Sequence, residues 1–252
     1  MYREFRPDHR LRPFVECGWL RSGLATPSIR VMPDGCVDVF VTADGNVMIS
    51  GPANTFYDMP TCNQDVLAGL RLSPGAAAAV IGSPASEFTN VRVPLDSAFG
   101  IAGHRMADRL LEAVTPTRRM SLLGDLVLDY FATVEPVLDQ PVVRAVSVLR
   151  SDPDTPVSAL AVEVGLSERQ LRRRFEVAVG YGPKRLGRVF RFQRLLDLIH
   201  ASHDVPRWSQ LAITAGYADQ SHMINECVAL AGRPPTTLPV SVSSNTGAAP
   251  PS

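Results

Sequence analysis

The fold is decided by residues 156–196, PVSALAVEVGLSERQLRRRFEVAVGYGPKRLGRVFRFQRLL. Apolar residues recur at helical spacing on both sides of a turn: Leu160, Ala161 and Val164 before it, Leu171 and Phe175 after it. Gly165 can adopt the positive φ that a sharp turn needs, and Ala161 is small enough for two helices to cross closely. The pattern therefore predicts a helix, a sharp turn and a second helix.

The second of these helices has two different faces. Ser167 is a good N-cap, and Gln170 three residues later completes the capping-box pattern, so we expect the helix to begin at Ser167. When its apolar residues point inward, three arginines share the exposed side: Arg169, Arg172 and Arg173. Because guanidinium groups bind guanine edges bidentately and neutralise phosphates, double-stranded DNA is the first candidate partner.

The whole unit occurs twice. The motif LAxxxG at 160–165 recurs 51 residues later at 211–216, and each copy ends in GxxP, at 180–183 and at 232–235. LAxxxG alone is common in helix-loop pairs, but two copies in register, each ended by GxxP, indicate an internal repeat. The sequence therefore predicts two helix-turn-helix motifs.

Residues 141–238 resemble the tandem helix-turn-helix domain of AraC/XylS-type transcriptional regulators. The resemblance rests on four segments: GLSERQLRRRF (165–175), GYGPK (180–184), RVFRFQRLLDLI (188–199) and GYADQSHM (216–223). In that family a single chain places two recognition helices in successive major grooves of DNA. The resemblance implies a sequence-specific transcription regulator that binds operator or promoter DNA and contacts RNA polymerase, and it leaves open whether transcription is raised or lowered.

One long helix is expected to join the two motifs, from Pro183 to about Ala201. Its length of roughly 27 Å can set the two recognition helices about one DNA turn (~34 Å) apart. The chain as a whole is neutral, with 25 basic and 25 acidic residues. Basic residues nevertheless gather in this region, as expected of one DNA-facing surface. The nine between Gly165 and Leu195 are Arg169, Arg172, Arg173, Arg174, Lys184, Arg185, Arg188, Arg191 and Arg194.

The second motif departs from the family pattern. Its recognition helix is expected at Asp219–Leu230, where Asn225 replaces the usual Arg, Cys227 replaces a core Phe, and a basic pair is missing. Asn and Gln can pair with adenine, but the phosphate-neutralising charge is absent, so we expect the first recognition helix to dominate. The candidate DNA-contacting residues are Arg169, Gln170, Arg172, Arg173, Lys184, Arg188, Gln220, Ser221, His222 and Asn225.

Residues 1–97 are predicted to form a small β-rich regulatory domain, cupin-like or barrel-like. A hairpin is expected in 30–50, with a turn at Asp44-Gly45, and another strand at 67–72. Short helices are expected in PGAAAAVIG and in SPASEFTN, with Ser83 as the N-cap of the latter. In the hairpin Val37, Val39 and Val41 alternate with Cys36, Asp38 and Phe40.

The N-terminal half also resembles, in PDGCVDVFV and LRLSPGAAAAVIGSPASEFTNVRVPL, the N-terminal module of a subset of these regulators. The resemblance implies a domain that responds to a small-molecule effector or mediates association. Because alternating strands leave one face to enclose a cavity, we expect an apolar pocket. Asp38 is either a ligand contact or a hydrogen-bonding residue near a turn.

Residues 98–138 are expected to be a helical connector and the candidate contact of a homodimer. Two apolar stripes support helices here, the first comprising Leu110, Leu111 and Val114, the second running from Leu122 to Phe131. Residues 139–238 form the predicted DNA-binding domain, and 239–252 have the composition of a disordered tail. The expected fold class is α+β, with a β-rich N-terminal domain and an all-α C-terminal domain.

The cysteines and the ends of the chain suggest an ordinary cytoplasmic protein. Cys17, Cys36, Cys62 and Cys227 lack the spacing of metal ligands, and neither a signal stretch nor a membrane span is found. We expect no metal or other cofactor and no membrane partner.

Two other classes of function remain as alternatives. A DNA alkyl-acceptor or other enzyme fused to a helix-turn-helix domain would need an activated thiol, which these cysteine spacings do not offer. Catalytic motifs such as GxSxG or HExxH are missing too, so we expect no enzyme activity. A protein-binding antagonist that has lost DNA affinity is made credible by the neutral second motif.

Overall fold

The computed structural model describes residues 2–22, 28–42, 44–60, 67–202 and 207–238. Its N-terminal part is a six-stranded antiparallel sheet in the order β1-β2-β7-β4-β5-β8. A separate two-stranded antiparallel sheet pairs β3 with β6 and is called the ribbon below. The strands are β1 (Tyr2–Phe5), β2 (Val15–Arg21), β3 (Ser28–Val31), β4 (Val37–Val41), β5 (Val47–Ser50), β6 (Tyr57–Pro60), β7 (Leu67–Leu72) and β8 (Arg92–Pro94).

The predicted hairpin is confirmed as β4 and β5, joined at the Asp44-Gly45 turn. Val37, Val39 and Val41 lie in the core under the helices, whereas Phe40 lies in a smaller cluster on the opposite face with Trp19. Side chains of a strand alternate between the two faces of the sheet, so one strand serves both clusters. The predicted strand at 67–72 is β7, which pairs with β2 and β4.

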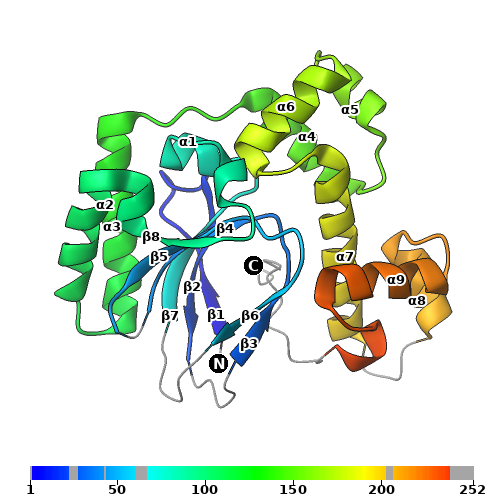
Figure 1. The fold of residues 1–252 in the computed structure, drawn as a ribbon, viewed down its shortest axis with the longest axis horizontal. Helices are drawn as coiled ribbons and strands as arrows, with labels where there is room; N and C mark the ends of the chain where they lie inside the picture. The colour runs from blue at the N-terminus through cyan, green and yellow to red at the C-terminus, as the bar shows by residue number, and fades with distance from the viewer. Residues whose placement is uncertain (1, 23–27, 43, 61–66, 203–206, 239–252) are drawn as a thin grey trace.

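Helices cover one face of the large sheet (Figure 1). This is the face from which Val37, Val39 and Val41 point into the core. Two long ones, α2 (Leu95–Leu111) and α3 (Pro116–Val134), pack on it, and two short ones, α1 (Ala77–Ile81) and the 3₁₀ helix η1 (Ala85–Phe88), contact the C-terminal domain.

The expectation that Ser83 caps η1 is wrong, because the cap position is occupied by Pro84. In the first apolar stripe Leu110 is buried, whereas Leu111 and Val114 are exposed. Val114 lies beyond the end of α2 and so does not share its buried face.

In the described residues the regular structure of the C-terminal part is helical, which confirms the α+β fold class. Its elements are α4 (Gln140–Ser151), α5 (Val157–Glu163), α6 (Glu168–Val179), α7 (Pro183–Ala201), α8 (Trp208–Ala215), α9 (Gln220–Ala231) and the 3₁₀ helix η2 (Pro235–Thr237). The linker helix α7 has the predicted bounds. The expected tail at 239–252 lies outside the described residues, as does Cys62.

The linker helix runs from the first motif to the second (Figure 1). It contributes residues to two separate hydrophobic cores, one for each motif. In the first, Leu186 and Val189 of α7 pack with residues of α4, α5 and α6. In the second, Phe192 and Leu195 pack with residues of α8 and α9. Met32 of the N-terminal domain is buried in this second core as well. Since burial of apolar surface holds each motif to the same helix, α7 determines their separation.

Candidate nucleic-acid interface

The first recognition helix, α6, begins as the sequence predicts. The Ser167 side chain accepts a hydrogen bond from the Gln170 backbone N–H, and the Gln170 side chain accepts one from the Ser167 backbone, which completes a capping box. Leu171 and Phe175 are fully buried. The outward side is polar, and its exposed residues include Arg169, Gln170, Arg172 and Arg173. The structure therefore brings the four candidate residues of this helix together at its N-terminal end.

Several of the nine basic residues are bound within the protein. Arg172 pairs with Glu168 one helical turn away, at 2.9 Å, but stays exposed. Arg174 is partly buried and donates to Asp139 at 3.2 Å. Arg191 is buried, so its inclusion in the DNA-facing surface was wrong: it lies on the inward side of α7 between the two motifs. Lys184 is exposed near the start of α7 and remains available to a phosphate.

Arg191 is the centre of a partly buried ion cluster that joins the two motifs: Arg191 and Glu226 are buried, and Asp154 is exposed. Its guanidinium donates to Asp154, in the loop before α5, and to both oxygens of Glu226 in α9, at 3.1 Å. Arg188 donates to Glu226 as well, at 3.2 Å. Burial alone would lower the pKa of Arg191, but the two carboxylates outweigh it and raise that pKa. Arg188, a candidate phosphate contact, thus also has a structural partner.

The second recognition helix, α9, is capped at its N-terminus by Asp219. The Asp219 carboxylate accepts a hydrogen bond from the His222 backbone N–H at 2.7 Å. Gln220, Ser221 and Asn225 are exposed on the outward side. His222 is half-buried: its Nδ1 accepts from the Ala218 backbone, and its ring packs edge-on against Tyr217 at 5.3 Å. The His222 side chain is therefore bound within the second motif, whereas the other three candidates of this helix are exposed.

The two recognition helices differ in charge. Residues 168–179 contain four Arg and two Glu, whereas residues 220–231 contain no Lys or Arg and one Glu, which is buried against Arg191. A negatively charged partner would therefore meet exposed positive charge on the first helix and none on the second.

The C-terminal ends of both recognition helices rest on the N-terminal domain, an arrangement that sequence reasoning missed. Thr89, after η1, donates to the carbonyl of Gly180 at the end of α6, at 3.0 Å. At the end of α9, Thr55 Oγ1 donates to the Ala229 carbonyl at 3.0 Å and the Phe56 backbone N–H donates to the Leu230 carbonyl at 2.8 Å. No motif announces these contacts, because they join residues over 90 positions apart. They leave the N-terminal ends of the helices, which carry most of the candidate residues, turned to solvent.

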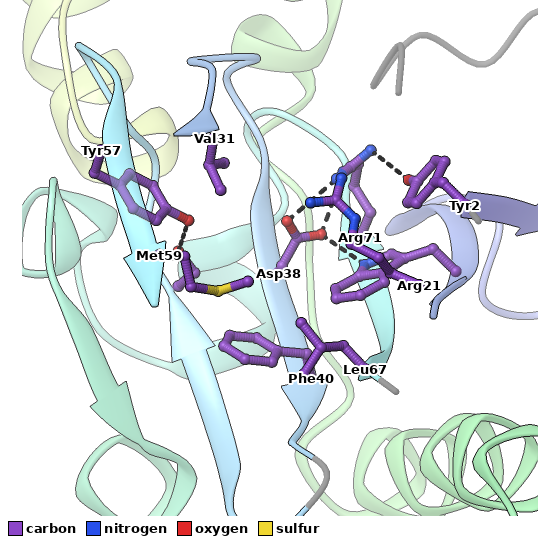
Figure 2. A pocket seen from close by; sticks show the side chains of 11 residues that line it. Tyr2, Arg21, Val31, Asp38, Phe40, Tyr57, Met59, Leu67 and Arg71 are labelled. Carbon is purple, nitrogen blue, oxygen red and sulfur yellow. Dashed lines mark hydrogen bonds and ion pairs between the residues drawn. The ribbon is translucent and has the colours of Figure 1, made fainter. Parts of the chain in front are cut away.

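A small pocket lies between the ribbon and the large sheet (Figure 2). Asp38 lines it, accepting from Trp19 Nε1 at 3.0 Å and pairing with the buried Arg71, whose Nε lies 3.2 Å from Asp38 Oδ1. Gly69 allows this packing, because a Cβ there would lie 2.6 Å from the Trp19 ring. Asp38 is thus a hydrogen-bonding residue inside a pocket. The other lining residues are Tyr2, Arg21, Val31, Phe40, Ser50, Tyr57, Met59 and Leu67.

The buried thiols do not have the character of nucleophiles. Cys17, Cys36 and Cys227 are buried, and burial raises the pKa of Cys17 and of Cys227 to about 12 and raises that of Cys36 as well. A reactive cysteine needs a lowered thiol pKa, so these three thiols are unsuited to alkyl-acceptor chemistry. Within the described residues, no group of three or more His, Cys, Asp and Glu side chains could hold a metal ion. None of the helices in the described part of the chain is long and apolar enough to cross a membrane.

Comparisons with solved structures give weak overall similarity. ToxT from Vibrio cholerae O395 shares 11% of residues with this chain at a TM-score of 0.44, over 94% of this chain and 95% of that one. Wild-type ToxT from Vibrio cholerae strain SCE256, bound to an unsaturated fatty acid, shares 10% at a TM-score of 0.41, over 93% of this chain and 89% of that one. No curated protein is significantly similar in sequence.

Comparison with family models divides the chain into two matched regions. Residues 3–94 match a domain of unknown function (DUF6597), and residues 160–238 match a helix-turn-helix domain. The second region spans both capped recognition helices and the linker between them. Residues 160–238 are therefore an AraC-type helix-turn-helix domain, the DNA-binding module of that family of transcription regulators.

Proposed function

We propose that this protein is a sequence-specific transcription regulator that reads successive major grooves of double-stranded DNA with α6 and α9, the first being dominant. The observation that carries the proposal is the exposed group Arg169, Arg172 and Arg173 in the N-terminal half of a capped helix whose inner face is buried. In helix-turn-helix proteins this end of the recognition helix contacts the base edges.

The roles of the candidate residues follow from their positions. Arg169, Gln170, Arg172 and Arg173 supply base and phosphate contacts from α6, and Lys184 and Arg188 supply phosphate contacts from α7. Gln220, Ser221, His222 and Asn225 supply neutral base contacts from α9, with Asn225 and Gln220 suited to adenine. We propose domain boundaries of 1–97, 98–138 and 139–238 to accompany these roles.

DNA binding is tested by selecting bound fragments from a genomic library with the full chain and measuring affinity for one footprinted site at several salt concentrations. We expect specific binding that weakens steeply with salt, because each neutralised phosphate contributes about 0.9 to the slope of log affinity against log salt. A full chain that is folded by circular dichroism yet binds no fragment at low salt would favour the antagonist instead.

We also propose that the pocket beside Asp38 binds an effector. Its walls are largely aromatic and aliphatic, with Trp19, Phe40 and Tyr57 among them, which suits a small, flat and mainly apolar molecule. Burial lowers the pKa of Arg21, so an anionic group on the ligand, placed beside this guanidinium, would favour its charged form.

The effector proposal is tested by thermal melting with phenylacetate, phenylethanol and phenethylamine, which share a ring and differ in charge. A ligand that binds only the folded state raises the melting temperature, and we expect phenylacetate to raise it most. Equal shifts for all three compounds, or none, would contradict the proposed ligand class.

A homodimer and a contact with RNA polymerase remain predictions. Ile101, Leu111 and Val114 are exposed on or just after α2, which makes this region the candidate dimer contact. Light scattering on the full chain and on Leu111→Glu distinguishes a dimer from a monomer.

A further inference from the structure

We propose that the ribbon transmits occupancy of the N-terminal pocket to the second helix-turn-helix motif and leaves the first motif unaffected. This inference rests on the proposed function, in which the pocket holds an effector of a DNA-binding regulator. It adds the route between the two sites and names which motif responds.

The inner face of the ribbon forms one wall of the pocket. Val31 of β3 and Tyr57 and Met59 of β6 line the cavity, across from Asp38 and Phe40 of the large sheet (Figure 2). Tyr57 and Ser50 of β5 share a hydrogen bond of 2.9 Å between their hydroxyl groups. A molecule that fills the pocket must therefore press on the ribbon or displace this hydrogen bond.

The outer face of the same ribbon holds the end of α9. Arg30 is paired with Asp58 in the strand register, and its guanidinium binds both carboxylate oxygens of Asp58, at 2.8 and 2.7 Å. Arg30 Nη1 also donates to the carbonyl of Ala231, the last residue of α9, at 3.2 Å. Because successive side chains in a strand point to opposite faces, residues that line the pocket alternate with residues that bind the helix.

The loop before β6 completes this attachment. Thr55 and Phe56 donate to the Ala229 and Leu230 carbonyls, and the Arg30 guanidinium lies 4.2 Å from the centre of the Phe56 ring. The Phe56 ring packs so closely on Gly232 that a Cβ there would lie 2.4 Å from it. The last carbonyls of a helix have no donor within the helix. Three of those in α9 are satisfied here by the N-terminal domain.

The two functions of the ribbon meet at adjacent residues. Phe56 binds α9, and Tyr57, the next residue, lines the pocket. A shift of β6 at Tyr57 displaces the planar peptide unit that joins Tyr57 to Phe56, and with it the Cα of Phe56, whose own backbone N–H donates to Leu230. The end of α6 is attached at other residues: Thr89, the segment around η1, and Pro52, which lies ahead of β6 of the ribbon. We therefore expect the ribbon to move without loosening α6.

The test is amide hydrogen exchange on the full chain, without DNA, for a two-by-two set of variants. Val31→Phe fills the pocket from the ribbon side and stands in for a ligand, and Phe56→Ala removes the ring that packs on Gly232. Ser28→Phe, on the same strand but exposed, is the matched control for added bulk. The reporters are the amides of Phe56 and Gly232, and the reference is the amide of Gly180 at the end of α6, which donates to Glu176 at 3.2 Å.

We expect Val31→Phe to accelerate exchange at the α9 reporters on the order of tenfold, within the coupling range of residues in contact, and to leave Gly180 unchanged. In the Phe56→Ala background the same substitution should add less than twofold, because the route is already broken. Unchanged exchange at α9, an equal change at Gly180, or full additivity of the two substitutions would each overturn the proposal.

If Val31→Phe does not fold, Met59→Phe fills the same pocket from β6 and replaces it in the set. The exchange readout involves no DNA, so its failure is distinct from failure of the proposed function. A chain that binds DNA specifically but shows additive exchange would retain the regulator assignment and lose the ribbon route.

Discussion

The two helix-turn-helix motifs share a backbone plan but differ in how they use charge. In the first, three of the four arginines of α6, Arg169, Arg172 and Arg173, are exposed to solvent. In the second, the acidic residue of α9 is buried against Arg191 and Arg188, and the outward side is neutral. Charge is therefore exposed to a partner in the first motif and neutralised within the protein in the second. The two copies of an internal repeat can therefore keep the same backbone geometry while their charged side chains differ in position and exposure.

The largest difference between the two motifs is expected when a charged partner of the buried Glu226 is removed. We expect Arg191→Ala to lower the free energy of unfolding by about 3 kcal/mol, because it leaves Glu226 buried without its main partner. Arg144→Ala in the first motif removes an exposed pair with Glu163 and should cost less than about 1 kcal/mol. Urea unfolding followed by helical circular dichroism measures both. Equal losses would mean that the two motifs do not differ in this respect.

A second test measures how the stability of the N-terminal domain and of the second motif depends on pH. Asp34 precedes Gly35, which packs against Leu186 and Phe190 of the linker helix. Burial raises the pKa of Asp34 to about 6; Arg71 opposes this rise, whereas Asp38 and Glu16 add to it. Between about pH 4 and pH 6 the folded state binds a proton that the unfolded state has lost, so stability falls as pH rises through this window.

Asp34→Asn should flatten this pH dependence, since the amide does not titrate and its oxygen can still accept the hydrogen bond from the Cys36 backbone. The measurement is urea unfolding at pH 4, 5, 6 and 7, monitored by Trp19 for the N-terminal domain and by Trp208 for the second motif. An unchanged slope in the variant would show that Asp34 is not the titrating group. A change seen by Trp208 alone would show unequal support of the motifs.

The third test concerns the dominance of the first recognition helix. Arg173→Ala should reduce specific DNA affinity on the order of tenfold, because it removes a base or phosphate contact and part of the counterion release. Arg169→Ala and Arg172→Ala should resemble it, and Asn225→Ala should cost less. Binding isotherms at several salt concentrations on one footprinted site give both affinities and slopes. If Asn225→Ala proves the most damaging, the second helix is the principal reader.

The smallest expected difference lies in the helix caps. Ser167→Ala removes one half of a capping box and should cost about 1 kcal/mol of stability. Asp219→Asn keeps a side-chain oxygen at the cap of α9 and should be nearly neutral. Thermal unfolding of the two variants against the wild type is sufficient. A larger loss for Asp219→Asn would indicate that the negative charge, rather than the hydrogen bond, stabilises α9.

The sequence predicted local structure well and long-range contact poorly. The capping box, the linker from Pro183 to Ala201 and the β4–β5 hairpin follow from spacing and turn chemistry, which act over a few residues. The burial of Arg191 could not be read from its own helix, because its partners are Asp154 and Glu226. Strands β1, β3, β6 and β8 are three or four residues long, too short for their alternation to identify them. The pocket was expected as a feature of the fold, but its residues come from strands whose pairing no local pattern reveals.

The ion cluster around Arg191 also limits how such proteins can be recombined. Asp154 precedes the first motif, Arg191 lies in the linker and Glu226 belongs to the second motif, so one guanidinium connects three separate segments. A chimera that takes its second motif from another regulator would bury Arg191 against a foreign residue. The second motif therefore cannot be replaced independently of the rest of the domain. A stable chimera would have to keep Asp154, Arg191 and Glu226 together.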